Sequence, residues 1–206
     1  MSQVTDLPVS PDVVPEHTLN AAQWGMASFL LSEVAFFSTL IVTYVTFIGR
    51  DVVGPLPAEV LSLSLVILTT AFLLTSSVTI HAAERALARG EQWFFRFFWA
   101  ATILLGIAFL AGTAYEWHDL IEKQGLTISR NLFGTTFYTL VGFHGLHVTA
   151  GVIALTIVLW LSLRGELGKK HSTGVQLVAW YWHFVDAVWV VVFLVVYVFG
   201  RGRGVG

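Results

Sequence analysis

Five long apolar stretches dominate this chain of 206 residues and restrict how it can fold. A helix needs about 20 apolar residues to cross the roughly 30 Å of hydrocarbon in a bilayer. Helices also satisfy their own backbone hydrogen bonds, which lipid cannot do. We expect membrane spans at residues 22–48, 58–82, 93–116, 131–163 and 175–199. The predicted fold is therefore all-α, an integral membrane bundle of five transmembrane helices within residues 22–200.

The composition agrees with a membrane protein and excludes several kinds of partner. Apolar residues make up 56% of the chain and charged residues only 12%, against about a quarter charged in soluble domains. The net charge of -2 lacks the basic surface of a nucleic-acid binder, so nucleic acid is not an expected partner. Without cysteine there are no disulfides, iron-sulfur clusters, thiolate zinc sites or covalently attached haem. A metal would need histidine and carboxylate ligands.

The two ends of the chain are expected to face opposite sides of the membrane. Residues 1–21 contain three acids and no lysine or arginine, unlike a signal peptide, and we interpret them as a polar tail. Residues 201–206 form a second short tail. Six basic residues lie on the N-terminal side of the membrane: Arg85, Arg89, Arg96, Arg164, Lys169 and Lys170. Only three lie on the other side when the C-terminal tail is left out, so the positive-inside rule places the N-terminus in the cytoplasm and the C-terminus outside, in the periplasm or extracellular space.

A few ionisable side chains interrupt the apolar spans. They are Glu33, Glu116, His144, His147, His183 and Asp186. A charged group near the bilayer centre costs roughly 2.5 to 3.5 kcal/mol on insertion scales, so these groups should face the protein interior and find partners there. Because Glu33 and His147 lie at matching depths, we expect a hydrogen bond between them, with His183 as the second choice for Glu33.

Two interpretations of these groups stay open. In one they only hold helices together through hydrogen bonds, each worth about 0.6 kcal/mol on average. In the other, a carboxyl group at mid-depth marks a functional site, and Glu33 exchanges protons or contacts a partner protein. For His144 and His183 both interpretations are equally tenable. For His183 and Asp186 we expect hydrogen bonds to another helix or to a partner.

Metal binding and nucleophilic catalysis are both disfavoured. His144 and His147 lie on neighbouring positions of one helix face and could begin a metal site. However, the Glu-x-x-His pairs of di-iron bundles are absent, and Glu116 is expected near a membrane face. No nucleophile elbow or phosphate-binding loop is present either. We therefore expect no metal, no bound cofactor and no catalytic centre in this chain.

Three segments together resemble subunit III of the haem-copper respiratory oxidases, the cytochrome c and quinol oxidases. They are Ser-Glu-Val-Ala-Phe-Phe at 32–37, the region 127–151 with Gly-Phe-His-Gly-Leu-His-Val at 142–148, and Trp-Tyr-Trp-His-Phe-Val-Asp at 180–186, followed by Trp189. Their order and spacing match the last five helices of that subunit. The resemblance extends over about residues 22–200.

The resemblance implies an accessory subunit without redox metals. Haems and copper would belong to the catalytic subunit I, which reduces oxygen and pumps protons, with subunit II as a further partner. Subunit III is associated with phospholipid binding, rapid proton uptake and protection from inactivation during turnover. Glu33 matches the family's membrane-embedded carboxylate, Glu116 an acid that ends its helix, and the other four ionisable residues the histidine and aspartate motifs. A bacterial plasma membrane is the expected location.

The chain departs from the larger family members in three places. Their two additional N-terminal helices have no counterpart, a histidine-rich connector is replaced by Glu84 and Arg85, and Leu161 stands where a basic residue is expected. Lipid headgroup contacts are therefore not transferred. Arg164, one turn after Leu161, and Arg96, which would extend toward the headgroups from an aromatic cluster, remain the candidates.

The sequence context of Glu33 favours the cytochrome c branch, with a quinol oxidase as the alternative. An independent proton-coupled transporter should instead show inverted repeats and broken helices, which this sequence lacks. A metal-dependent membrane enzyme would contain stoichiometric iron or zinc.

Overall fold

The part of the chain that the structure describes is a bundle of long helices. The computed structural model describes residues 19–51, 54, 61, 63–167 and 172–200. Its helices are α1 (Ala21–Phe47), α3 (Leu63–Ala88), α4 (Gln92–Glu122), α5 (Leu132–Leu163) and α6 (Ser172–Phe193), and a π-helical segment, η2 (Leu194–Phe199), continues α6. Five helices, counting α6 with η2 as one, are long and apolar enough to cross a membrane. The prediction of an all-α bundle with five spans is confirmed.

Two helices extend beyond the apolar spans expected from the sequence. Helix α3 continues to Ala88 instead of ending near residue 82, and α4 continues to Glu122 instead of residue 116. Hydropathy marks the part of a helix that lies in hydrocarbon, whereas backbone hydrogen bonding continues into the polar region. Helix α3 begins at Leu63, and most of the expected span start at residues 58–62 lies outside the described residues. Most of the N-terminal tail and all of the C-terminal tail also lie outside the described residues.

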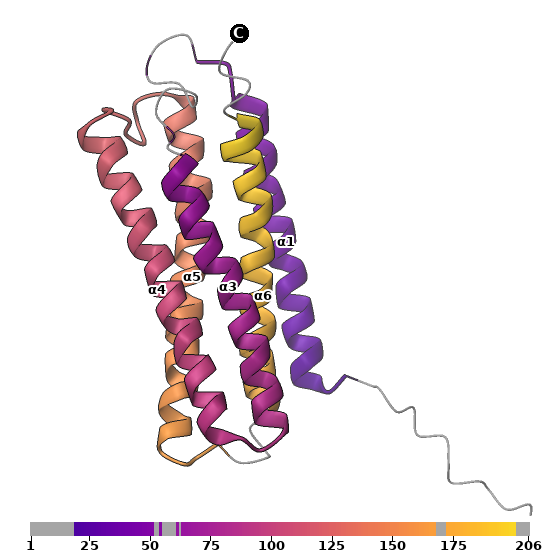
Figure 1. Ribbon diagram of the computed structural model, residues 1–206. Helices are drawn as coiled ribbons and strands as arrows, with labels where there is room; N and C mark the ends of the chain where they lie inside the picture. Colours follow the sequence, from indigo (N-terminus) through magenta and orange to yellow (C-terminus); the bar gives the residue numbers. More distant parts are fainter. Residues whose placement is uncertain (1–18, 52–53, 55–60, 62, 168–171, 201–206) are drawn as a thin grey trace, which may run out of the picture.

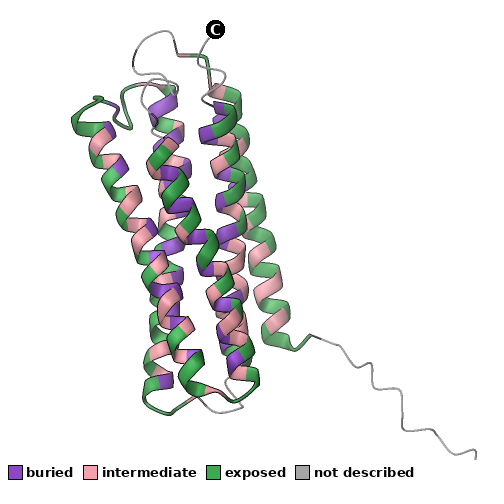
Figure 2. Cartoon of the chain, in the orientation of Figure 1, coloured by how far each residue is buried: buried purple, intermediate pink, exposed green. Residues whose placement is uncertain are grey.

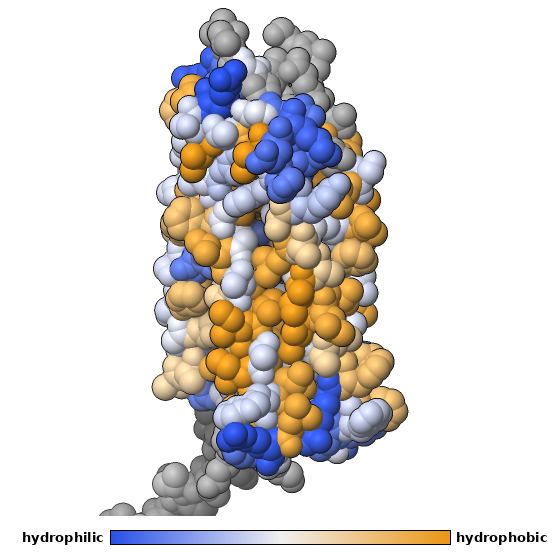
Figure 3. All heavy atoms as spheres, turned by 90° about the vertical axis from the view of Figure 1, so that its left-hand side faces the viewer, coloured by the Kyte–Doolittle hydropathy of each residue, from blue (hydrophilic) through white to orange (hydrophobic). Residues whose placement is uncertain are grey.

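The helices run up and down in alternation (Figure 1). Helices α1, α4 and α6 run in one direction and α3 and α5 in the other, so the α3–α4 connection and the start of α6 lie at the end where α1 begins. Helix α3 packs along α4, and α1 lies at the edge of the bundle against α5 and α6. Only Phe37 and Tyr44 of α1 are buried (Figure 2). On one face of the molecule an apolar band separates two polar ends, as a bilayer requires (Figure 3).

Polar side chains fix the start of α5. The Asn131 side chain accepts a hydrogen bond from the Gly134 backbone N–H at 2.8 Å. The Asp51 carboxylate accepts from the N–H groups of Leu132 and Phe133 at 2.9 and 2.8 Å. These N–H groups have no partner within the helix, and a carboxylate also complements the positive end of the helix dipole. Asp51, which follows α1 in the chain, thereby ties the end of α1 to the start of α5.

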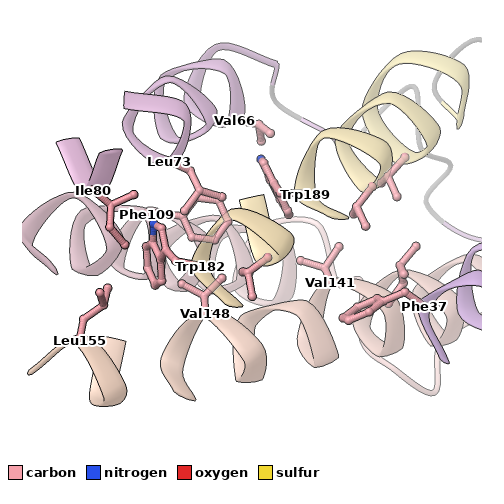
Figure 4. Close-up of a cluster of buried hydrophobic side chains, with 14 of the residues drawn as sticks. Phe37, Val66, Leu73, Ile80, Phe109, Val141, Val148, Leu155, Trp182 and Trp189 are labelled. Atoms are coloured by element: carbon pink, nitrogen blue, oxygen red, sulfur yellow. The ribbon is translucent and has the colours of Figure 1, made fainter. Parts of the chain in front are cut away.

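The side chain of Trp182 in α6 packs closely against three other helices. Its indole N–H donates to the Ser76 hydroxyl of α3 at 2.8 Å. A methyl group added at Gly106 of α4 or at Gly151 of α5 would meet the Trp182 ring at 2.7 Å. The ring therefore fits only because both glycines lack a side chain. Figure 4 shows Trp182 and Trp189 among buried apolar side chains of the neighbouring helices.

We predict that Gly151→Ala destabilises the bundle, because the added methyl group overlaps the rigid Trp182 ring. Overpacking of this kind costs about 1 to 3 kcal/mol. Thermal unfolding in detergent would show a lower midpoint for this variant. Gly145→Ala is the matched control on the same helix, because nothing lies within 4 Å of the added atom. Equal midpoints for the two variants would contradict the packing described for Trp182.

Candidate functional site

Glu33 and His147 form a polar pair between α1 and α5. The Nε2 atom of His147 lies 3.0 Å from Oε2 of Glu33. Each side chain is 18% exposed, so the pair lies near the surface of the bundle without being open. Phe36 and Phe37 place their rings 6.2 and 4.9 Å from the imidazole, and the Tyr181 hydroxyl of α6 donates to the His147 carbonyl at 3.0 Å. The expected partner of Glu33 is thus confirmed.

The geometry determines how many protons the pair holds. Nδ1 of His147 lies 2.7 Å from the Phe143 carbonyl oxygen, which can only accept, so Nδ1 carries a hydrogen. A neutral imidazole then offers a lone pair at Nε2, and Glu33 must be protonated to donate to it. Alternatively the ring is an imidazolium and Glu33 is a carboxylate. In both forms one proton lies between the two residues and the net charge is zero.

A second group joins α3 to α6. The Ser77 hydroxyl donates to Oδ2 of Asp186 and lies 3.2 Å from Nδ1 of His183. Asp186 is 3% exposed and its other oxygen, Oδ1, has no partner within the described part of the chain. The expected helix-to-helix hydrogen bonds of His183 and Asp186 are confirmed, and Ser77 supplies them.

His144 is separate from both groups. Its side chain is fully buried, and it stacks on the Trp189 ring with centroids 4.9 Å apart and 28° between the planes. The rings of Phe37 and Phe109 lie in T-shaped arrangements with the imidazole. Neither ring nitrogen has a hydrogen-bond partner among the described residues. His144 thus packs in the core as an aromatic ring.

Glu116 faces the interior from α4, toward the other end of the bundle. It is 5% exposed, and the Tyr197 hydroxyl of η2 donates to its Oε2 atom at 2.9 Å. Its Oε1 atom and the Tyr44 hydroxyl are buried without partners among the described residues. A π-helix has one more residue per turn than an α-helix and often marks a functional position. Here η2 contains the tyrosine that reaches Glu116.

The two candidate headgroup residues contact the protein. The Arg96 guanidinium donates from Nε to the Ser162 hydroxyl at 3.0 Å and from its terminal nitrogen to the Ser162 carbonyl at 2.5 Å. These bonds reach the C-terminal end of α5, where a cation complements the helix dipole. The Ser162 carbonyl also accepts from the Gly165 backbone N–H at 3.1 Å. Arg164 lies over the Trp160 ring, 3.7 Å from its centroid. Lipid contact by either residue stays a prediction.

Outside the spans, the α3–α4 connection carries a salt bridge. Arg89 donates from Nε to the Glu91 carboxylate at 2.9 Å. This hydrogen bond lowers the pKa of Glu91 and raises the pKa of Arg89. Both groups therefore remain charged near neutral pH, as expected at the polar end of a membrane bundle.

Sequence reasoning missed Ser77 and Tyr197, the two hydroxyl partners of buried carboxyl groups. The run Thr75-Ser-Ser-Val-Thr79 inside an apolar span was the available signal for Ser77. For Tyr197 no comparable signal existed, because a tyrosine near a span end is also typical of interfacial residues. The described residues contain no group of three or more His, Asp or Glu side chains placed to hold a metal ion.

The fold and these pairs define a helical membrane protein whose interior carboxyl groups form hydrogen bonds with its own side chains. Residues 12–201 match the family model described as Cytochrome c oxidase subunit III. Cytochrome c oxidase subunit 3 of Corynebacterium diphtheriae is 34% identical over 181 residues, covering 86% of this chain and 88% of the relative. The subunit of the same name from Synechocystis is 38% identical over 178 residues, covering 84% and 74%.

A probable cytochrome c oxidase subunit 3 from Nocardia farcinica is 35% identical over 188 residues, covering 88% of this chain and 91% of the relative. The chain belongs to the cytochrome c oxidase subunit III family. Membership in this family of haem-copper oxidase subunits implies a complex with other oxidase subunits.

We predict that Tyr197→Phe destabilises the protein, because it leaves both Glu116 oxygens buried without a hydrogen-bond donor. An unsatisfied buried group costs about 1 to 3 kcal/mol. The unfolding midpoint in detergent should fall accordingly. Tyr115→Phe is the control, since the Tyr115 side chain is 63% exposed. If both variants unfold with the wild-type midpoint, the Tyr197–Glu116 hydrogen bond contributes nothing.

Proposed function

We propose that this chain is the non-catalytic subunit III of a proton-pumping cytochrome c oxidase. It supports the stability, lipid binding and proton supply of a catalytic subunit that reduces oxygen to water. The observation that carries this proposal is the Glu33–His147 pair. It places one proton between two helices within the apolar part of the bundle.

The pair suits proton handling for two reasons. It carries no net charge in either proton arrangement, which limits the cost of burial in lipid. It also needs only a small displacement of a proton along one hydrogen bond to change which residue is ionised. Imidazole and carboxyl groups commonly exchange protons near neutral pH. The same bond holds α1, an edge helix, against α5.

An accessory role is supported by how the interior groups are used. Glu33 bonds to His147, Asp186 to Ser77 and Glu116 to Tyr197. Each of these carboxyl groups therefore has a hydrogen-bond partner within this chain. Haems and copper belong in partner subunits, with subunit I as the catalytic neighbour and subunit II as a further one. Phospholipid fills the lipid-facing surface.

The proposed setting is a bacterial plasma membrane with the N-terminus in the cytoplasm. The α3–α4 connection and the end of α5 lie on the side of the N-terminus, and Arg85, Arg89, Arg96 and Arg164 are found there. An excess of basic residues favours the cytoplasmic side. The cytochrome c branch is favoured over the quinol branch by the sequence around Glu33 and at 180–186.

We predict that the chain, purified in mild detergent, brings with it a larger haem-bearing polypeptide. Family membership calls for partner subunits. A visible spectrum of the purified material, together with its polypeptide composition, provides the measurement. Recovery of the chain as a haem-free single component under conditions that preserve other membrane complexes would count against the proposal.

We predict that Glu33→Gln alters sustained turnover of the oxidase complex. The amide of glutamine can still donate to Nε2 of His147, so the helices stay joined, but the ionisable proton is lost. Oxygen consumption should decline faster during continuous turnover than in the wild type. Glu122→Gln, at the exposed end of α4, is the matched control. Unchanged turnover, unchanged inactivation and unchanged assembly in Glu33→Gln would together refute a role for Glu33.

A further inference from the structure

The Ser77 hydroxyl connects Asp186 to His183 in a directed chain of hydrogen bonds. Ser77 has one hydrogen, which it donates to Oδ2 of Asp186. Toward Nδ1 of His183, at 3.2 Å, the Ser77 oxygen can therefore only accept. Nδ1 of His183 must then carry the hydrogen, which leaves Nε2 with a lone pair. The three groups form a donor sequence that runs from the imidazole through the hydroxyl to the carboxyl group.

Between Ser77 and the membrane face, helix α3 contains two further titratable groups, His81 and Glu84. His81 follows Ser77 by one helical turn and lies on the same face of α3. The Glu84 carboxylate lies 3.9 Å from Nδ1 of His81, and the two side chains are 26% and 54% exposed, respectively. Residues three and four apart share one face of a helix, so these groups form a line along α3.

The line ends in a space that water can enter. Glu84 lines a cavity of about 970 Å³ at the end of the bundle where α3 ends. Arg89, Gln92, Ser172 and Gln176 are among the other lining residues, so part of its wall is polar. Asp186, by contrast, is buried and has no cationic partner among the described residues. Ser77, which bonds Asp186, thus lies on the same face of α3 as His81 and Glu84, and Glu84 lines the cavity at the membrane face.

We propose that Asp186 is a proton-exchange site of this subunit and that Ser77, His183, His81 and Glu84 form its path to the membrane face. Glu84 and His81 receive the proton from water at the surface, and His183 and Ser77 deliver it. This role goes beyond the proposed function, which rests on Glu33, and the two can fail separately.

In the proposed transfer one proton enters at His183 and one proton ends on the Asp186 carboxylate, so protons are balanced. A proton arriving from His81 binds Nε2 of His183, and the resulting imidazolium releases its Nδ1 proton to the Ser77 oxygen. Ser77 passes its own hydrogen to Oδ2 of Asp186. The carboxylate becomes a carboxylic acid, and the imidazole is neutral again with its hydrogen on Nε2. Rotation of the ring or a second proton transfer restores the starting arrangement.

Other titratable groups on the helices packed against α6 are accounted for separately. Glu33 and His147 hold their proton in their own hydrogen bond. His144 has no hydrogen-bond partner among the described residues and stacks on Trp189. A purely structural hydrogen bond between Ser77 and Asp186 would also hold α3 to α6. It would not require His81 or Glu84, and this difference makes the proposal testable.

The test is infrared difference spectroscopy of the intact oxidase complex during exchange from H₂O to D₂O. We expect a carboxylic-acid band that shifts on deuteration and is missing in Asp186→Asn. In Ser77→Ala the band should move to higher frequency, because the carboxyl group loses a hydrogen bond. Its exchange should also slow by about 100-fold, as expected when a positioned proton-transfer group is removed. His81→Gln should slow exchange while leaving the band position unchanged.

Thr75→Ala is the matched control on α3, because the Thr75 hydroxyl is exposed and bonds only to the Ala71 carbonyl of its own helix. His81→Gln guards against loss of folding, since His81 is exposed and makes no contact with Asp186 in the core. The proposal is overturned if no carboxylic-acid band depends on Asp186 at any pH from acid to alkaline. Wild-type exchange rates in both Ser77→Ala and His81→Gln would overturn it equally.

Discussion

The bundle depends on the close fit of Trp182 among four helices. In lipid no hydrophobic force drives helices together, so close packing and interhelical hydrogen bonds must do so. Trp182 provides both, with its N–H on Ser76 of α3 and its ring against Gly106 of α4 and Gly151 of α5. Because this contact sets the distances of α3, α4 and α5 from α6, it also sets where a side chain on one helix can reach another.

Each interior carboxyl group is stabilised by a different neutral or balancing partner. Glu33 shares a proton with an imidazole, while Asp186 and Glu116 accept from the hydroxyls of Ser77 and Tyr197. The partner determines what each carboxyl group can do with a proton. An imidazole can take the proton itself, whereas a hydroxyl group can only relay it or hold the carboxyl group in place. Glu116, whose bond to Tyr197 involves no imidazole, is therefore the most structural of the three.

The number of spans and the Glu33–His147 pair were predictable because both depend on position along the chain. Apolar length gives the spans, and matching depth brought the two residues together. The partners of Asp186 and Glu116 depend instead on how far each helix is rotated about its axis. Ser77 competes with several hydroxyl residues of α3, and Tyr197 reaches Glu116 through a π-helical turn that no periodicity indicates. Arg96 likewise bonds to Ser162 of α5, and apolar length does not indicate which helix an arginine near a span end contacts.

Helix α6 contacts the Glu33–His147 pair and also contains Asp186. Tyr181 donates to the carbonyl of His147 on one side of α6, and Asp186 bonds to Ser77 on the other. Tyr181 and Asp186 are only five positions apart on one helix, and Trp182 anchors the helix between them. A rotation of α6 that lengthened one contact would therefore change the other, whereas a rigid α6 keeps them independent. The close fit of Trp182 against two glycines favours the rigid case, so the two groups should exchange protons without influencing each other.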